Sequence, residues 1–138
     1  MSVRIEIHYE GELQCTAVHT PSGDRLRTDA PLDNRGRGEH FSPTDLVAAA
    51  LGNCIVTVMA IAARDRDIDM TGTRAQVSKE MSAVPRRHIS KLTVDLVLPA
   101  HLEPRARRVL ERAATTCPVH ASLGPGTVVD LRFTYEPV

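Results

Sequence analysis

The sequence predicts a single α+β domain. Three features carry this prediction: alternating apolar and polar segments near both ends, one long apolar segment in the middle, and an amphipathic segment after it. A chain of 138 residues fits one domain, whose core can bury roughly two-thirds of the unfolded surface. We therefore expect one domain over residues 1–138, with antiparallel strands around a long buried central helix.

The N-terminal segment predicts an antiparallel meander of three strands. Residues 3–9 alternate between apolar and charged side chains, which is the pattern of a half-buried strand. Gly11 turns the chain into a second strand over residues 13–20. A turn at residues 22–24 leads to a short third strand over residues 25–28. The next twelve residues contain Pro, Asn and Gly without periodicity, and loops of this length are often functional.

The central helix has a clear start signal. Ser42 is a good N-cap, Pro43 suits the first helical position, and Asp45 completes the S-x-x-D form of a capping box. The helix should run to about Arg64. Because it is apolar nearly all round, we expect it to be buried.

The C-terminal half predicts two strands, two helices and a last strand. Residues 70–80 and 89–98 form a long hairpin, a helix opens at residues 103–104, a short helix spans residues 118–123, and residues 127–135 form a strand. The first of these helices has a charged face that should be exposed to solvent. This face comprises Arg105, Arg107, Arg108, Glu111 and Arg112.

Composition excludes some classes of function. Lys plus Arg and Asp plus Glu both total 17, and aromatic residues make up only 3%, so neither charge nor base stacking favours nucleic acid. The N-terminus does not resemble a signal peptide, and the apolar segment contains Thr44, Asp45, Asn53 and Thr57, which suit a bilayer poorly. We expect a cytoplasmic protein without membrane or nucleic-acid partners, whose cysteines are thiols rather than structural disulfides.

Two of the three cysteines stand in settings that allow chemistry. Cys54 lies in the apolar helix and could be either core packing or a reactive thiol. Cys117 directly precedes Pro118 and should cap the short helix, where partial positive charge lowers a thiol pKa. The pair suggests an attacking and a resolving thiol. Cys15 alternates within a strand and is most simply a core or sheet-face residue.

The residues SPTDLVAAALGNC, followed some sixty positions later by TTCPVHASL, resemble the OsmC/Ohr family of osmotically inducible and organic-hydroperoxide-resistance proteins. The resemblance implies an OsmC-like fold and an intertwined homodimer with active sites at the interface. It also implies that Cys54 reduces an organic hydroperoxide and becomes a sulfenic acid, and that Cys117 resolves this to a disulfide. An external dithiol, dihydrolipoyl or thioredoxin-like, would then reduce the disulfide, with no cofactor or metal.

The sequence departs from the family at the position that activates the thiol. Well-characterised hydroperoxidases of the family carry a Glu ten positions before the attacking cysteine, where this chain has Thr44. The neighbouring Asp45 is a candidate, although capping is a sufficient role for it. The pattern is closer to the less characterised OsmC-like subgroup. The arginine beside the thiol should come from the N-terminal strands or the long loop, and the candidates are Arg25, Arg27, Arg35 and Arg37.

Helix geometry indicates whether Asp45 could contact Cys54 of its own chain or only that of a second subunit. Nine residues along a helix separate Asp45 from Cys54 by roughly 13 Å and by about half a turn around the axis. Asp45 therefore cannot touch Cys54 of its own chain. If it helps catalysis, it does so for a second subunit, and a two-fold homodimer would also cover the remaining apolar surface of the helix.

Three other functions remain open. Cys117-x-x-His120 with Cys54 could hold zinc, although a second short-spaced ligand pair is missing. A Cys–His acyl-transfer enzyme could use His120 as base, but no oxyanion-hole motif supports it. The third alternative is a non-enzymatic redox sensor or a protein that binds a small apolar ligand, and Thr44 in place of Glu favours it.

Overall fold

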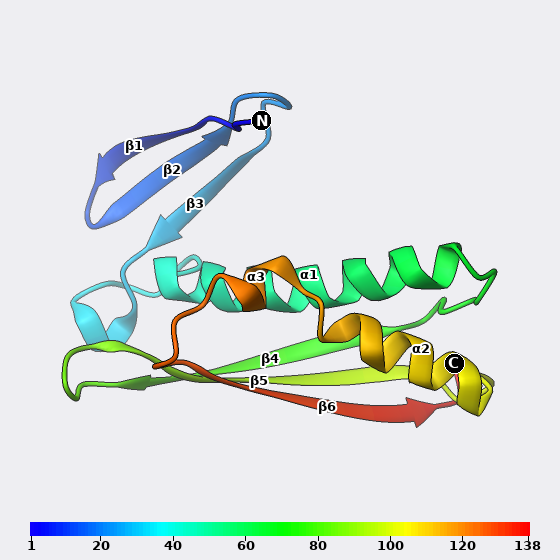
Figure 1. Ribbon diagram of the computed structural model, residues 1–138. Helices are drawn as coiled ribbons and strands as arrows, with labels where there is room; N and C mark the ends of the chain where they lie inside the picture. Colours follow the sequence, from blue (N-terminus) through cyan, green and yellow to red (C-terminus); the bar gives the residue numbers. More distant parts are fainter. The chain divides into compact units, whose positions relative to one another are not determined.

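The computed structural model describes residues 1–138 and confirms the predicted α+β class (Figure 1). By internal contacts the chain divides into two compact units, Met1–Val47 and Ala48–Val138. The elements in chain order are β1 (Ile5–Gly11), β2 (Gln14–His19), β3 (Arg25–Asp29), a 3-10 turn η1 (Leu32–Asn34), α1 (Pro43–Arg64), β4 (Arg74–Ser82), β5 (His88–Pro99), α2 (Pro104–Ala114), α3 (Pro118–Ala121) and β6 (Val128–Glu136).

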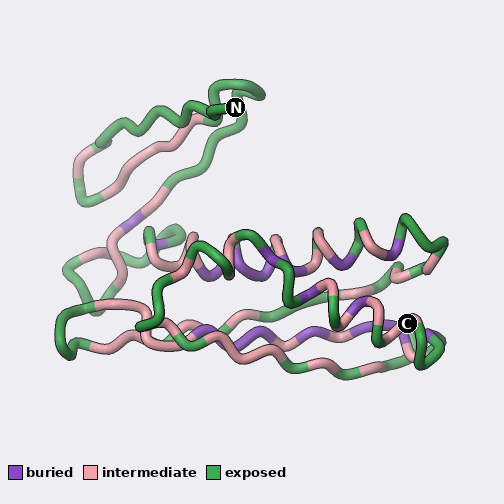
Figure 2. The backbone as a smooth tube through the Cα atoms, viewed as in Figure 1, coloured by how far each residue is buried: buried purple, intermediate pink, exposed green.

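The first unit contains the predicted meander. Its strands pair antiparallel in the order β1-β2-β3, and Tyr9, Cys15 and Thr28 lie side by side across the sheet. The alternating apolar residues of β1 were expected to be half-buried, but they are exposed within this chain, Ile7 by 62% and Tyr9 by 67% (Figure 2). A three-stranded sheet has two faces, and no second layer of this unit covers them.

Helix α1 begins as the sequence predicts. The Oγ of Ser42 accepts a hydrogen bond from the backbone N–H of Asp45 at 3.1 Å, and Oδ2 of Asp45 accepts from the N–H of Ser42 at 2.9 Å. This reciprocal pair is a capping box, which satisfies two of the free N–H groups at the helix start. The helix then runs without interruption from Pro43 to Arg64.

Only one face of α1 is buried within the chain, in contrast to the predicted burial on all sides. The buried residues recur every three or four positions and are Ala48, Leu51, Gly52, Ile55, Met59 and Ala63. Leu51, Ile55 and Met59 have no exposed surface. The opposite face carries Asn53 and Thr57, whose side chains hydrogen-bond to backbone carbonyls one turn earlier.

The length and hydropathy of α1 would also suffice for a membrane span, a criterion that core helices of soluble proteins meet as well. The fully buried side chains on α1 belong to the hydrophobic core of the second unit, together with side chains of β5 and α2.

The second unit is a three-stranded sheet, β4-β5-β6, with residues 48–64 of α1 and the helices α2 and α3 on one face (Figure 1). The central strand β5 supplies Leu92, Val94, Leu96 and Leu98 to the core, at alternate positions. Strand β4 pairs antiparallel with β5, as predicted, but β6 pairs parallel with it. The reason is the crossover through α2 and α3, which returns the chain to the end of the sheet where β5 begins.

The sequence predicts that the charged face of α2 is exposed to solvent, but two of its residues are engaged in contacts with the rest of the chain. The guanidinium of Arg107 lies 4.0 Å from the ring centre of Tyr135 and donates hydrogen bonds to the carbonyls of Ala100 and Leu102, each at 2.8 Å. The hydroxyl of Tyr135 donates to Glu111 at 2.9 Å. These contacts connect α2 to β6 and to the end of β5, so two of the five charged residues have a structural role.

Candidate functional site

Cys54 lies in the middle of α1, on the border between its buried and exposed faces. Its side chain is half-buried and packs against the hydrophobic core. Its neighbours Leu51 and Ile55 are fully buried, while Asn53 is exposed. The thiol is therefore held by packing but is not sealed inside the protein, which is the exposure that a reactive cysteine needs.

Cys117 occupies the N-cap of α3, as predicted. Its Sγ accepts a hydrogen bond from the backbone N–H of His120 at 3.4 Å, and Pro118 fills the first helical position. Proline suits that position because it has no N–H to leave unsatisfied. Only 1% of the residue is exposed, so Cys117 is a buried cap at the junction of α2 and α3.

The fold brings the Cys54 and Cys117 thiols together, and both are unbridged. Burial raises the pKa of Cys117 above its usual 9.0, and the neighbouring Cys54 side chain raises it further. The backbone N–H groups of His120 and Val119 act in the opposite direction but are outweighed. The prediction that the helix end lowers the Cys117 pKa is therefore wrong, because desolvation dominates at this depth.

Nothing around the two thiols forms a metal-binding cluster. The backbone N–H of His120 contacts Cys117, but no group of three or more His, Cys, Asp or Glu side chains lies close enough together to hold a metal ion.

A groove lies between α1 and α2, with a volume of about 420 Å³, and neither Cys54 nor Cys117 is among the residues that line it. Small-molecule sites typically have roughly 300–1,000 Å³, with apolar walls and a few polar groups. Apolar side chains form most of its walls, and a few charged side chains border it. The lining residues are Val58, Ile61, Ala62, Asp65, Arg66, Val109, Arg112, Ala113 and Thr116. Sequence reasoning had assigned Arg112 only to a solvent-exposed face.

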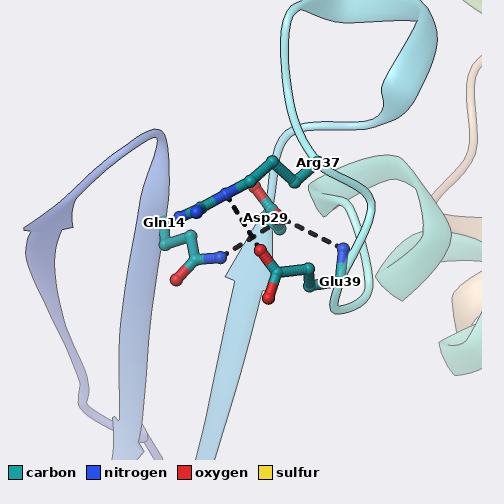
Figure 3. Close-up of polar contacts among 4 residues, drawn as sticks. All are labelled: Gln14, Asp29, Arg37 and Glu39. Carbon is teal, nitrogen blue, oxygen red and sulfur yellow. Dashed lines mark hydrogen bonds and ion pairs between the residues drawn. The ribbon is translucent and has the colours of Figure 1, made fainter.

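The predicted arginines belong to the first unit. Arg25 and Arg27 lie on β3, and their side chains are exposed. Arg35 follows η1 with a left-handed backbone (φ 71°) and is also exposed. Arg37 donates from Nε to Oε1 of Glu39 at 2.9 Å (Figure 3). The structure therefore gives Arg37 a defined partner in the long loop.

Asp29 organises this loop, and sequence reasoning missed it. Its carboxylate, only 1% exposed, accepts hydrogen bonds at Oδ2 from the Gln14 side chain (3.2 Å) and from the backbone N–H of Glu39 (3.0 Å) (Figure 3). The Glu39 N–H is the main reason that the Asp29 pKa is lowered, with Gln14 and the N–H groups of Arg37 and Ala30 adding to it. Its Oδ1 is buried without a hydrogen-bond partner. The sequence does contain a signal for Asp29, because it is an acidic residue at the end of a predicted strand, just before a Gly-rich loop.

Close approach of the backbone fixes the loop further. A Cβ on Gly36 would overlap the carbonyl of Ala30, so only glycine fits where the loop folds back on its own start.

Asp45 and Thr44 both lie in the first turn of α1. Asp45 takes part in the capping box, and the Thr44 hydroxyl lies 3.2 Å from the Ser42 hydroxyl. Capping of α1 is therefore one role of Asp45.

The sequence of residues 36–132 matches the OsmC-like protein family. The chain belongs to this family. A protein of Psychrobacter arcticus, described as induced by osmotic stress and involved in detoxification, shares 38% identity, with 94% of each chain covered and a TM-score of 0.88. A comparison with curated proteins finds no match.

More distant OsmC-like structures share the fold. An organic hydroperoxide resistance protein of Legionella pneumophila has 16% identity and a TM-score of 0.77, with 97% of each chain covered. One of Elizabethkingia anophelis, with thiocyanate bound, has 14% identity and a TM-score of 0.78, with 99% of this chain and 97% of the other covered. The OsmC-like architecture predicted from the cysteine motifs is thereby confirmed.

Proposed function

We propose that this OsmC-like protein is a thiol-dependent peroxidase that reduces organic hydroperoxides to alcohols. The observation that carries the proposal is the contact between a half-buried thiol, Cys54, and a buried one, Cys117. The mostly apolar groove between α1 and α2 is compatible with an organic substrate. Structural relatives from Legionella and Elizabethkingia described as organic hydroperoxide resistance proteins agree with this chemistry.

The different burial of the two thiols supports the roles that we propose for them. The Cys54 thiolate attacks the outer peroxide oxygen, so that an S–O bond forms, the O–O bond breaks, and the alkoxide leaves and takes up a proton. The Cys117 sulfur then attacks the sulfenic acid of Cys54, forming the disulfide and releasing water. Burial raises the pKa of Cys117, which favours its neutral thiol form before this second step. A dithiol, dihydrolipoyl or thioredoxin-like, returns both thiols.

We also propose that the protein is a cytoplasmic homodimer with its active sites at the interface. The exposed apolar residues of β1, together with Ile61 on α1 (56% exposed), form surface that a second copy would cover. The activating arginine would come from Arg25, Arg27, Arg35 or Arg37. Arg37 has the best-defined position, through Glu39 and Asp29.

The test is turnover of tert-butyl hydroperoxide with a dithiol reductant. We expect Cys54→Ser to abolish turnover and Cys117→Ser to trap a sulfenic acid on Cys54, while Cys15→Ser, on the β2 strand, retains activity. One equivalent of peroxide should produce a Cys54–Cys117 disulfide in a non-reducing mass measurement. Absence of turnover with every dithiol would contradict the proposal.

A non-enzymatic redox sensor is the second candidate, and Thr44 favours it. In the family's characterised peroxidases a Glu at this position orients the activating arginine, whereas here the Thr44 hydroxyl lies beside the Ser42 cap. A sensor would form a stable sulfenic acid on Cys54 while Cys117 remained a free thiol, and it would not turn over.

A further inference from the structure

We infer that Cys54 and Cys117, in their reduced form, are a binding site for trivalent arsenic compounds that carry one organic substituent. The observation behind this inference is that two unbridged thiols meet in a part of the fold that offers no third ligand for a metal. The inference goes beyond the proposed function, because it needs only the reduced thiol pair and no turnover of peroxide.

The two thiols are held in place by different elements of the second unit. Cys54 lies in the middle of α1 and packs against the hydrophobic core, of which Cys117, at the N-cap of α3, is a buried member. Both residues are fixed by helical backbone and by packing, so a ligand that bonds to both sulfurs does not have to order a flexible segment. Preorganisation of this kind lowers the entropic cost of binding.

The number of thiols restricts which element fits between them. Sulfur ligands select soft, thiophilic elements. Structural zinc sites need four ligands, and no group of three or more His, Cys, Asp or Glu side chains lies close enough together here. Trivalent arsenic forms three bonds, and in a monosubstituted arsenical one of these bonds already goes to carbon. Two thiols therefore complete its coordination.

The burial of Cys117 also favours a neutral ligand. The residue is only 1% exposed, and desolvation raises the pKa of its thiol, which favours the neutral form. A metal cation would require the sulfurs as thiolates and would bring charge into an apolar core, which is costly. A monosubstituted arsenical reacts with neutral thiols, and its product with two thiols is neutral as well.

The reaction is a condensation in which no atom changes its oxidation state. In the hydrated arsenical, two hydroxyl groups are bonded to arsenic. Two As–O bonds break and two As–S bonds form, and each thiol proton leaves with one hydroxide as water. Arsenic stays trivalent, so the step needs neither an oxidant nor a reductant. The organic substituent leaves the site on the side of Cys54, because that residue is half-buried whereas Cys117 is enclosed.

The test is titration of the reduced protein with phenylarsine oxide, followed by mass spectrometry. We expect one phenylarsenic group per chain, which 2,3-dimercaptopropanol removes and an equal concentration of 2-mercaptoethanol does not, because only a dithiol forms a competing chelate. Cys54→Ser and Cys117→Ser should each weaken binding roughly 10²–10⁴-fold, the gain that a second linked contact provides. Cys15→Ser, on β2, is the matched control and should bind like the wild type.

Two further measurements use the wild type and do not depend on how the variants fold. Diphenylarsinous acid can form only one As–S bond, so it should bind roughly 10²–10⁴-fold more weakly than phenylarsine oxide. Protein that has been oxidised with diamide, and whose Cys54–Cys117 disulfide has been verified by mass, should bind neither compound.

Four results would overturn the inference. Equal affinity for the two arsenicals would show that only one thiol is engaged. Undiminished binding by Cys117→Ser or by the disulfide form would place the arsenic elsewhere. Loss of binding in Cys15→Ser would assign the arsenic to the first unit. Displacement of the arsenical by an equal concentration of zinc chloride would identify a metal site instead.

These outcomes are separate from those for the proposed function. Peroxide turnover without binding of phenylarsine oxide would contradict this inference alone. Binding of phenylarsine oxide without peroxide turnover would contradict the peroxidase alone.

Discussion

Burial and the hydrogen-bond donors around a group together set the pKa shifts of Cys117 and Asp29. Cys117 caps a helix, where a thiolate would ordinarily be favoured, yet its pKa is raised because desolvation outweighs the cap. Asp29 is buried too, but its pKa is lowered, because backbone N–H groups surround its carboxylate. The two residues differ in the number of donors, not in depth.

Asp29 gives a prediction at this scale. Because its pKa is lowered in the folded protein, it contributes stability that is complete above its usual pKa of 3.8 and is lost as pH falls through the lower folded value. We expect Asp29→Asn to flatten the acid limb of the pH–stability curve, measured by chemical denaturation. Peroxidase kcat/KM should also fall if the loop positions the activating arginine.

Glu39→Gln is the control for this variant. It breaks the ion pair with Arg37 but keeps the backbone N–H that Asp29 accepts. The opposite result would contradict this assignment: a pH–stability curve that Asp29→Asn leaves unchanged at acidic pH but that Glu39→Gln flattens would show that the pH dependence comes from Glu39 and not from Asp29.

At the scale of elements, two specific contacts help to position α1 and α2 against the sheet. A Cβ on Gly52 of α1 would lie 2.7 Å from Cγ2 of Val77 on β4, so the helix packs closer to the strand than any other residue would allow without a shift. Helix α2 is connected to β6 by the contacts of Arg107 and Glu111 with Tyr135.

We expect Gly52→Ala to lower the free energy of unfolding by about 1 kcal/mol. Overpacking costs roughly 1–3 kcal/mol, and the better helix propensity of alanine returns about 1 kcal/mol of it. The measurement is urea denaturation. Gly124→Ala, where an added Cβ meets nothing within 4 Å, is the control. In a double-mutant cycle, Val77→Ala should relieve part of the cost, and strictly additive effects would contradict close packing.

Tyr135 makes alkaline stability depend on the α2 contact. Burial, and then the hydrogen bond with Glu111, raise its pKa from 10 to about 12. Stability should therefore be complete below pH 10 and fall as pH rises toward 12, because the unfolded chain loses this proton first. We expect Tyr135→Phe to reduce this decline. The measurement is the free energy of unfolding from denaturation at pH 9 and at pH 11. An equal decline in both proteins would contradict the contact.

The elements were largely predictable from sequence, because capping, turn residues and periodicity are local signals. The capping box of Ser42 and Asp45 and the cap at Cys117 lie where those signals place them. The parallel pairing of β6 was not predictable, since it depends on where a crossover returns the chain. Asp29 carries a local signal, an acidic residue at the end of a strand, but its partners Gln14 and Glu39 are brought to it only by the fold.

At the scale of the whole molecule, exposed apolar surface predicts assembly. The β1 side chains Ile5, Ile7 and Tyr9 are each more than half exposed. If a second copy covers them, Ile7→Glu should shift the protein from dimer to monomer in light scattering and lower peroxidase activity with it. The control is His8→Glu on the opposite face of the strand. A wild-type monomer, or an unchanged dimer in Ile7→Glu, would contradict the homodimer.

The contact between Cys54 and Cys117 also has a mechanical consequence. A bond between them would tie α1 to the crossover that precedes β6 and close a ring of about 60 residues, which would restrict the unfolded chain by roughly 4 kcal/mol. The disulfide form would then be the more stable one, and reduction would destabilise the protein. Thermal unfolding with and without reductant should show a higher Tm for the oxidised protein. The Tm would therefore report whether the protein is in its disulfide form.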